Sequence, residues 1–474
     1  MKINKSNGVK NNLLKILIAA AEVTPIAKVG GLGDVIGALP KALSKLNLDA
    51  RVIIPFYGAI DRNKYKIKLI KQKIGVGEAL INLWQTNLPN STVPVYLIEH
   101  NFFKGREIYS NALADDPKDT KKYLFLAHAI LESLKALNFK PNVIHLNDWH
   151  TAAVPLLLKT DRQNNEFFKQ TKTLYTIHNL ANQGPAGQKT PVKSGETGAK
   201  LFDGVNYMAE GIINSGIVST VSPTYAKEIL TKKYGARLEN ILLKRKNQLY
   251  GILNGIDTDF FNPAADKLIK KNYSLETIEN KLNNKLSLQK KMGWPEDKDI
   301  ALVGLVTRFV WQKGIELITE KFSELNCQFV FLGTGEKRYE EALLNLAKKY
   351  PGKFKVLIKF DEKLAHEIYA GSDIFLVPSR FEPCGLTQMI AMRYGSVPIA
   401  RATGGLKDTV NAKVGFIFKQ FAATKFYDTL QKALNIYYNR PKAWNQLKKN
   451  GMRQDFSWNK SAKEYLKLYK KLIK

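Results

Sequence analysis

Short apolar runs alternate with longer stretches of helical pattern through both halves of the chain. Apolar runs of strand length, bounded by turn residues, are typical of strands buried in a parallel sheet. The runs are Lys15–Ala21, Ala50–Pro55, Val93–Ile98, Val143–Leu146, Lys172–Ile177 and Ile217–Val221, then Ile300–Val306, Gln328–Leu332, Phe354–Ile358, Asp373–Val377 and Val397–Ala400. Two such sets predict two doubly wound α/β domains. Ligands of these sheets bind at the carboxyl ends of the strands, so the segments after the runs are the candidates for function.

The length of the chain, 474 residues, also exceeds what one hydrophobic core supports. Turn-forming residues at Asn254–Asp257 and Asn262–Pro263 precede a helical stretch rich in lysine and asparagine, and they mark the expected boundary. We therefore place an N-terminal domain at 1–263 and a C-terminal domain at 264–455. An amphipathic helix is expected over 456–474, for which packing back on the N-terminal domain is one option.

Charge and composition exclude several classes of protein. The net charge of +31 suggests an anionic partner, but the lysines are dispersed and form no arginine-rich arm, so we expect a solvated basic surface and no specific nucleic acid. No apolar run approaches the roughly 18 residues that span a bilayer, so no membrane association is expected. Two cysteines, Cys327 and Cys384, show no pairing pattern, which favours a reducing cytoplasm.

The segment Ser379–Gln388 combines a carboxylate, a thiol and a glycine turn directly after a predicted strand, and Gly404-Gly405 follows it. We expect a helix that begins at Gly385 or Leu386. Free N–H groups at a helix start, with about half a positive charge from the helix dipole, favour a bound phosphate. The segment thus predicts a site for a phosphorylated sugar. The alternative is a purely structural turn, with Cys384 as a small buried hydrophobe and Glu382 as a surface cap.

A second glycine cluster, Lys28–Asp34, follows the first predicted strand and precedes a helix expected over Val35–Leu46. Its amides could face an oxyanion, Lys28 could supply an ammonium, and Asp34 could accept hydrogen bonds from hydroxyls. The spacing matches neither a nucleoside triphosphate loop nor a full dinucleotide fingerprint.

Two cations follow the first strand of the second half, within Val306–Gly314. Arg308 offers a two-pronged guanidinium and Lys313 a point charge, which together suit the two phosphates of a nucleoside diphosphate. Ordinary surface cations are the alternative. Their place at the end of a strand, in the same domain as Glu382, favours function.

Histidines end two predicted strands of the first half, at His145, His150 and His178. Their spacing matches no zinc motif and no cysteine cluster accompanies them, so we expect no metal and favour hydrogen bonding to a sugar. His366 lies in a helical setting, where capping or packing is the expected role.

Together these segments resemble the family of bacterial glycogen synthase and plant starch synthase, which extends α-1,4-glucan from ADP-glucose. The run Ser379–Gln388 is the most specific match, and Ile390 stands where many other retaining transferases carry a second glutamate that this family lacks. The resemblance covers nearly the whole chain. Its other stretches are Lys28–Leu39, His145–Thr151, Thr176–Gly184, Thr220–Glu228, Asn254–Asp257, Arg308–Gly314, Phe360–His366 and Thr403–Val410.

The resemblance implies a B-type glycosyltransferase fold, in which two Rossmann-like domains face a deep cleft. It implies retention at the anomeric carbon with no cofactor or bound metal, ADP-glucose being the donor substrate and glycogen or another α-1,4-glucan the acceptor. By position, the catalytic residues are Glu382, which holds glucose hydroxyls, His150, which contacts the transferring sugar, and Arg308 and Lys313, which hold the diphosphate. The donor-binding residues are Lys28, Gly30, Gly31, Asp34, Asn254, Phe360, which stacks on adenine, Cys384, Gly385, Leu386 and Thr387.

The sequence leaves some alternatives open. A related retaining transferase that uses UDP-glucose or another acceptor fits the same motifs, because no residue fixes adenine over uracil. A non-catalytic glucan-binding or nucleic-acid-binding protein on the same fold is the alternative from another class. The sequence does not set the oligomeric state.

Overall fold

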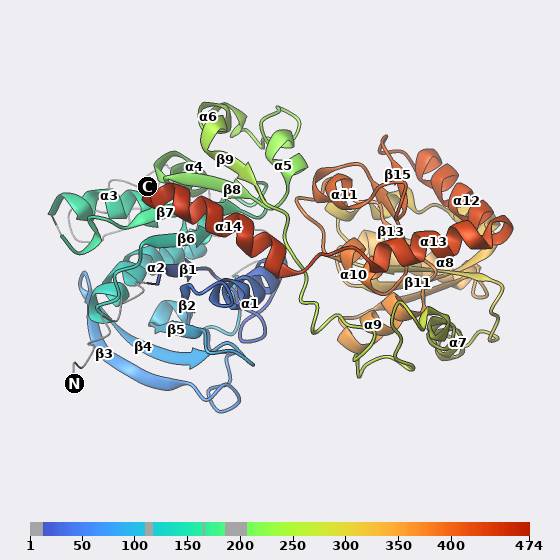
Figure 1. Ribbon diagram of the computed structural model, residues 1–474, viewed down its shortest axis with the longest axis horizontal. Helices are drawn as coiled ribbons and strands as arrows, with labels where there is room; N and C mark the ends of the chain where they lie inside the picture. Colours follow the sequence, from blue (N-terminus) through green and yellow to red (C-terminus); the bar gives the residue numbers. More distant parts are fainter. Residues whose placement is uncertain (1–12, 110–116, 165, 185–205) are drawn as a thin grey trace, which may run out of the picture. The chain divides into compact units, whose positions relative to one another are not determined.

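The computed structural model describes residues 13–109, 117–164, 166–184 and 206–474. The chain divides into two compact units, each built on its own sheet (Figure 1). The first unit runs up to Ser219 and takes in Tyr234–Tyr250 and Ser461–Lys474, while the second comprises Thr220–Lys233 and Gly251–Lys460. The predicted pair of parallel-sheet α/β domains is confirmed. Within the part of the chain that the structure describes, no helix is long and apolar enough to cross a membrane.

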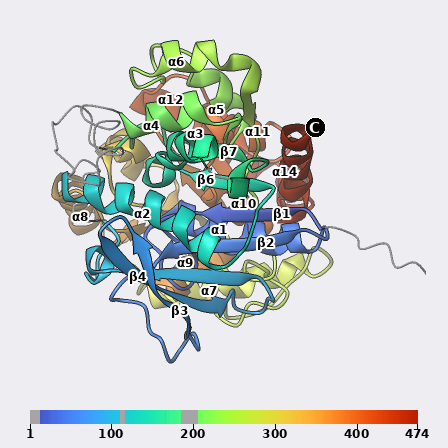
Figure 2. The same ribbon diagram turned by 90° about the vertical axis from the view of Figure 1, so that its left-hand side faces the viewer.

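The sheet of the first unit has the strand order β3-β4-β5-β2-β1-β6-β7-β8-β9. Strands β1, β2, β5, β6 and β7 pair in parallel and are largely buried, as their apolar sequences require. The hairpin of β3 and β4 extends one edge of this sheet in antiparallel fashion (Figure 2). The strands are β1 (Lys15–Ala19), β2 (Asp49–Pro55), β3 (Lys68–Val76), β4 (Ala79–Asn87), β5 (Pro94–Glu99), β6 (Val143–Asn147), β7 (Lys172–Ile177), β8 (Ile217–Thr220) and β9 (Leu249–Gly251).

The helices of the first unit connect these strands. They are α1 (Gly31–Ser44), α2 (Pro117–Ala136), α3 (Val154–Asn164), α4 (Tyr207–Asn214) and α6 (Glu239–Lys244), with the short 3-10 turns η1 (Asn101–Phe103), η2 (Trp149–Thr151), η3 (Glu166–Phe168) and η5 (Lys246–Gln248). The expected start of α1 at Val35 was wrong, since the helix begins at Gly31 after the extended Gly30. The glycines therefore form its first turn.

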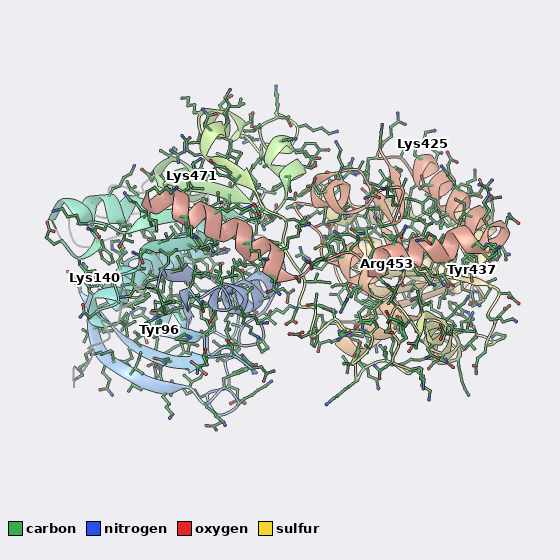
Figure 3. The ribbon with its side chains drawn as sticks, viewed as in Figure 1. Tyr96, Lys140, Lys425, Tyr437, Arg453 and Lys471 are labelled. Atoms are coloured by element: carbon green, nitrogen blue, oxygen red, sulfur yellow. The ribbon has the colours of Figure 1, made fainter. Side chains whose placement is uncertain are left out.

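The C-terminal helix α14 (Trp458–Ile473) packs on this unit although the chain reaches it after the second unit. Its Tyr469 is fully buried, and the hydroxyl lies 2.8 Å from Nδ1 of His145. Lys471, also on α14 (Figure 3), donates a hydrogen bond to the hydroxyl of Tyr250.

The second unit has a wholly parallel sheet in the order β12-β11-β10-β13-β14-β15. Its strands are β10 (Ala301–Val306), β11 (Cys327–Gly333), β12 (Phe354–Ile358), β13 (Ile374–Val377), β14 (Val397–Arg401) and β15 (Phe416–Phe418). The neighbours β10 and β13 are paired in register, Val303 with Ile374. Because they are parallel, the segments that follow them leave the sheet at the same edge. The segment after β10 carries Arg308 and Lys313, and the segment after β13 carries Ser379–Glu382.

The helices of the second unit are α5 (Pro223–Glu228), α7 (Lys281–Lys291), α8 (Lys337–Lys349), α9 (Glu362–Gly371), α10 (Thr387–Arg393), α11 (Gly404–Thr409), α12 (Ala423–Asn439) and α13 (Pro441–Met452), with the 3-10 turns η6 (Ile278–Asn280), η7 (Trp311–Lys313), η8 (Ile315–Leu317) and η9 (Glu320–Glu324). Of these, α8, α12 and α13 pack against a core of the sheet that includes Val303, Leu305, Phe329 and Phe331. The predicted start of α10 at Gly385 or Leu386 was one or two residues early, because Leu386 is its N-cap.

Candidate active site

The centre of the candidate site in the second unit is an ion pair between Lys313 and Glu382. The ammonium Nζ lies 2.5 Å from Oε2 of the carboxylate, and the side chains are 19% and 9% exposed. The same oxygen accepts a hydrogen bond of 2.9 Å from the hydroxyl of Ser379. Two loops far apart in sequence, one after β10 and one after β13, are thus joined by a nearly buried charge pair.

Arg401, the last residue of β14, holds the backbone of the Glu382 loop. Its Nε donates to the carbonyl of Ser379 at 2.8 Å, and its Nη2 donates to the carbonyl of Arg380. The residue is only 5% exposed. Carbonyls of an irregular loop have no partner in a sheet, so a buried guanidinium that binds two of them fixes the conformation of the loop.

The turn Thr403–Gly405 supports the Glu382 loop from the other side. A Cβ at Gly404 would lie 1.9 Å from the carbonyl oxygen of Glu382, so only glycine permits this approach. The Gly405 N–H lies 3.2 Å from that carbonyl, and the carboxylate of Glu228 accepts hydrogen bonds from the Gly404 N–H at 3.1 Å. Burial raises the pKa of Glu228 above its ordinary value.

Cys384 and Asn254 lie together beside this loop. The thiol accepts a hydrogen bond from the backbone N–H of Asn254, and burial raises the pKa of the thiol to about 12. Cys384 is therefore protonated and unreactive at neutral pH. The side-chain Oδ1 of Asn254 is buried and has no hydrogen-bond partner among the described residues, so it remains available to a ligand.

Arg308 and Phe360 are exposed residues of the same unit. Arg308 follows β10, five residues before Lys313, and forms no ion pair with any described residue. Phe360 lies 87% exposed between β12 and α9. Arg380, in contrast, forms an ion pair with Glu316, and its guanidinium carbon lies 3.9 Å from the centre of the Phe421 ring.

In the first unit, the glycine cluster already faces a carboxylate. Oε2 of Glu22 accepts hydrogen bonds from the N–H groups of Val29 and Gly30, at 2.7 and 2.8 Å, and the hydroxyl of Tyr109 donates to its Oε1. Lys28 and Asp34 pair with each other at 2.7 Å on the partly exposed surface. Two of the amides that were expected to bind an oxyanion thus bind the carboxylate of Glu22 instead.

His150 lies in η2, directly after β6, among the rings of Tyr109, Tyr123 and Trp149. Burial lowers its pKa to about 3, so the imidazole is neutral at physiological pH. Its Nδ1 is buried and finds no hydrogen-bond partner within the described ranges. A neutral, unpaired imidazole nitrogen suits hydrogen bonding to a hydroxyl.

Asp148 and Asn147 order the backbone beside His150. Oδ1 of Asp148 accepts the N–H of His178 at 2.7 Å, and Asn147 Oδ1 lies 2.9 Å from Nε2 of His178. Burial raises the pKa of Asp148 to about 7. His145 is fully buried between Tyr469 and Thr176, with a pKa lowered by burial to about 3, so its role is in packing.

His366 also packs rather than caps. It is buried on α9, its Nδ1 lies 2.7 Å from Oδ2 of Asp266, and the N-cap of α9 is Asp361 instead. Over the residues that can be described, no group of three or more His, Cys, Asp or Glu side chains is placed to hold a metal ion.

Comparison with known proteins decides the family. Residues 15–244 match the model described as starch synthase catalytic domain, and residues 284–454 match that of glycosyl transferases group 1. Glycogen synthase from Clostridium beijerinckii is 43% identical over 483 residues, with 97% of this chain and 99% of that protein covered. The chain belongs to the glycogen synthase family. Glycogen synthase from Thermosipho melanesiensis is 41% identical, with the same shares covered.

Solved structures agree with the glycogen synthase assignment. The catalytic domain of starch synthase IV from Arabidopsis thaliana, bound to ADP and acarbose, superposes with a TM-score of 0.88 at 33% identity, covering 97% of this chain and 99% of that one. Sucrose-phosphate synthase from Thermosynechococcus elongatus shares the fold, with a TM-score of 0.63 at 19% identity over 97% of this chain and 99% of that one. This glycogen synthase family member is therefore a glycosyltransferase with the B-type fold.

In this glycogen synthase family member, the second unit brings together Lys313, Glu382, Cys384 and Asn254 with the Gly404 turn. Lys28 and Asp34 contact each other in the first unit. Sequence reasoning missed the residues that hold these groups in place: Glu22, Tyr109, Ser379, Arg401 and Glu228. Ser379 and Glu228 fall within segments that resemble the family, which could have drawn attention to them. Nothing in the sequence marks Glu22 or Arg401, because their roles depend on backbone groups of distant segments.

Proposed function

We propose that this protein transfers glucose from ADP-glucose to the non-reducing end of an α-1,4-glucan, with retention at the anomeric carbon. The observation that carries the proposal is the Lys313–Glu382 pair, placed beside the end of β10 with the exposed Arg308 on the same loop. Membership of the glycogen synthase family and the ADP and acarbose bound by the related starch synthase IV support it.

The chemistry follows from where charge develops. As the bond between the glucose C1 and the phosphate oxygen breaks, negative charge grows on the leaving ADP, and fixed cations stabilise that state more than the substrate. Arg308 and Lys313 supply those cations. The departing phosphate oxygen takes the proton of the acceptor hydroxyl, whose oxygen forms the new bond to C1 on the same face. Glu382, an acceptor of hydrogen bonds, holds glucose hydroxyls.

The remaining predicted site residues have supporting roles in this proposal. Asn254 Oδ1, which is buried and unpaired within the described chain, accepts a hydrogen bond from the donor. Backbone groups of Gly385, Leu386 and Thr387 contact its phosphates, while Cys384 packs beside the sugar. Phe360 stacks on adenine, since an aromatic face 87% exposed is available for it.

Residues of the first unit complete the proposed set. The neutral His150 hydrogen-bonds the transferring sugar, and Lys28, Gly31 and Asp34 contribute to donor binding. Gly30 contributes through the close backbone approach that a glycine permits, since its N–H is bound to Glu22. We propose further that no cofactor is needed and that the protein works in a reducing cytoplasm, as its two free thiols, Cys327 and Cys384, suggest.

Incorporation of labelled glucose into glycogen tests the proposal directly. Purified protein is incubated with glycogen and either ADP-glucose or UDP-glucose, with and without EDTA. We expect incorporation from ADP-glucose that is unchanged by the chelator. Efficient use of UDP-glucose alone would identify a related transferase instead, and no incorporation from either donor would refute the activity.

A further inference from the structure

A cavity of about 250 Å³ in the second unit is lined by four lysines from three different elements. Lys267 and Lys270 lie on the loop before η6, Lys291 ends α7, and Lys363 lies in the first turn of α9. One carboxylate lines the cavity with them, Glu367, whose Oε2 lies 2.5 Å from Nζ of Lys291. The lining therefore carries a net positive charge. None of these residues belongs to the proposed donor site.

Three of the four ammonium groups have no carboxylate to neutralise them among the residues that the structure describes. Lys267, Lys270 and Lys363 are exposed and form no ion pair with any residue in the described ranges. Lysines on a convex surface can point away from one another, whereas lysines around a hollow share one small volume. Their mutual repulsion is relieved by an anion bound among them.

Buried and partly buried hydrogen bonds hold the segments around the cavity in place. Asn284 of α7 binds the backbone of Lys271 in both directions, at 2.8 and 3.0 Å. Asp266, directly before the loop, accepts the N–H of Leu268 at 2.8 Å and bonds to His366 of α9 and to the hydroxyl of Tyr394. A ligand thus meets a cavity that is already formed, which lowers the entropic cost of binding.

The size and lining of the cavity indicate the class of ligand. Its volume is below the roughly 300–1,000 Å³ of pockets for drug-sized molecules, which suits a small metabolite. The side chains of Asn284 and Ser287 add polar groups, and Leu268, Ile269 and Leu288 add apolar surface. We propose that the cavity binds a small phosphorylated metabolite that carries at least two negative charges.

Titration calorimetry with inorganic pyrophosphate, at about 0.15 M salt and without added nucleotide, tests this proposal. The pocket variant is Lys267→Ala/Lys363→Ala, and the matched control is Lys348→Ala/Lys442→Ala. The control removes the same charge at two exposed positions on α8 and α13 that form no ion pair among the described residues. All four lysines are exposed, so both variants should fold.

We expect the pocket variant to bind pyrophosphate at least about tenfold more weakly than the unaltered protein, while the control stays within about threefold. Lys313→Ala, which alters the proposed donor site, should keep the pyrophosphate binding that the pocket variant loses, and both lysine pairs should keep normal glucosyl transfer. The inference does not rest on the proposed function. It would be overturned by equal weakening in both double variants, by an unchanged pocket variant, or by no binding to the unaltered protein.

Discussion

The ion pair between Lys313 and Glu382 predicts separate effects on stability and on catalysis. Lys313→Ala leaves the Glu382 carboxylate with the hydroxyl of Ser379 but without its cation. Removal of one partner from a buried pair costs about 3–5 kcal/mol, and the 19% exposure of the lysine reduces this, so we expect a loss of about 2 kcal/mol. Turnover should fall by about two to three orders of magnitude, because a charge aimed at the leaving diphosphate is lost.

The double variant Lys313→Ala/Glu382→Gln separates the two effects. The neutral amide needs no cation, so we expect the double variant to recover about 1–2 kcal/mol of the stability that Lys313→Ala loses. Turnover should not recover. Urea unfolding followed by tryptophan fluorescence gives the first quantity, and transfer of labelled glucose from ADP-glucose to glycogen gives the second. Lys348→Ala, on the surface of α8, is the control for loss of a lysine.

Two outcomes would refute this reasoning. If Lys313→Ala had an unchanged urea midpoint, the pair would not be a buried interaction. If its turnover were close to that of the unaltered protein, Lys313 would have no part in departure of the diphosphate.

Three further predictions concern the donor, the loop scaffold and pH. Phe360→Ala should raise KM for ADP-glucose about tenfold with little change in kcat, because stacking on a base contributes about 1–3 kcal/mol; an unchanged KM would remove Phe360 from the site. Arg401→Lys should lower turnover about tenfold or more, since one ammonium cannot reproduce a planar fork bound to two carbonyls, and normal turnover would contradict its positioning role. Near pH 5, the three buried histidines His145, His150 and His178, with pKa values of about 3, take up protons only on unfolding, while Asp148, with a pKa of about 7, releases one. The unfolding free energy should therefore fall by about 2.7 kcal/mol per pH unit as pH decreases, and by about 4 kcal/mol per pH unit in Asp148→Asn. Equal slopes in the two proteins would show that Asp148 does not titrate in this way.

The strands that were predicted and those that were missed differ in burial. Lys172–Ile177 is a central strand, buried after its first residue, and it was placed at its observed ends because such strands are rich in apolar residues. Phe354–Ile358 was also placed at its observed ends, although it lies at the edge of its sheet and is mostly half-buried, because its mainly apolar run is bounded by lysines. The antiparallel strand β3, Lys68–Val76, was missed because it is lysine-rich and mostly exposed, so its sequence reads like a helix or loop. Its pairing with β4 comes from tertiary context.

The residues of the candidate site also divide into those that the sequence predicted and those that it did not. Residues that bear chemistry, such as Lys313 and Glu382, could be proposed from motifs at strand ends, and their contact with each other follows from the adjacency of β10 and β13. The side chains that bond to the backbone of the site loops could not be predicted from the sequence. Arg401 binds carbonyls 21 and 22 positions away, and Glu228 binds an amide 176 positions away. Such contacts leave no periodic or local pattern in the sequence.

The placement of α14 on the first unit has a consequence for biosynthesis. A ribosome makes Gly251–Lys460, most of the second unit, before it makes the segment whose Tyr469 meets His145 in the interior of the first. The face of the first unit that α14 covers in the complete chain therefore stays exposed to solvent while the second unit is translated and folds. Nascent chains halted before α14 should depend on chaperones, and a gene cut at residue 263 should yield an N-terminal fragment that aggregates.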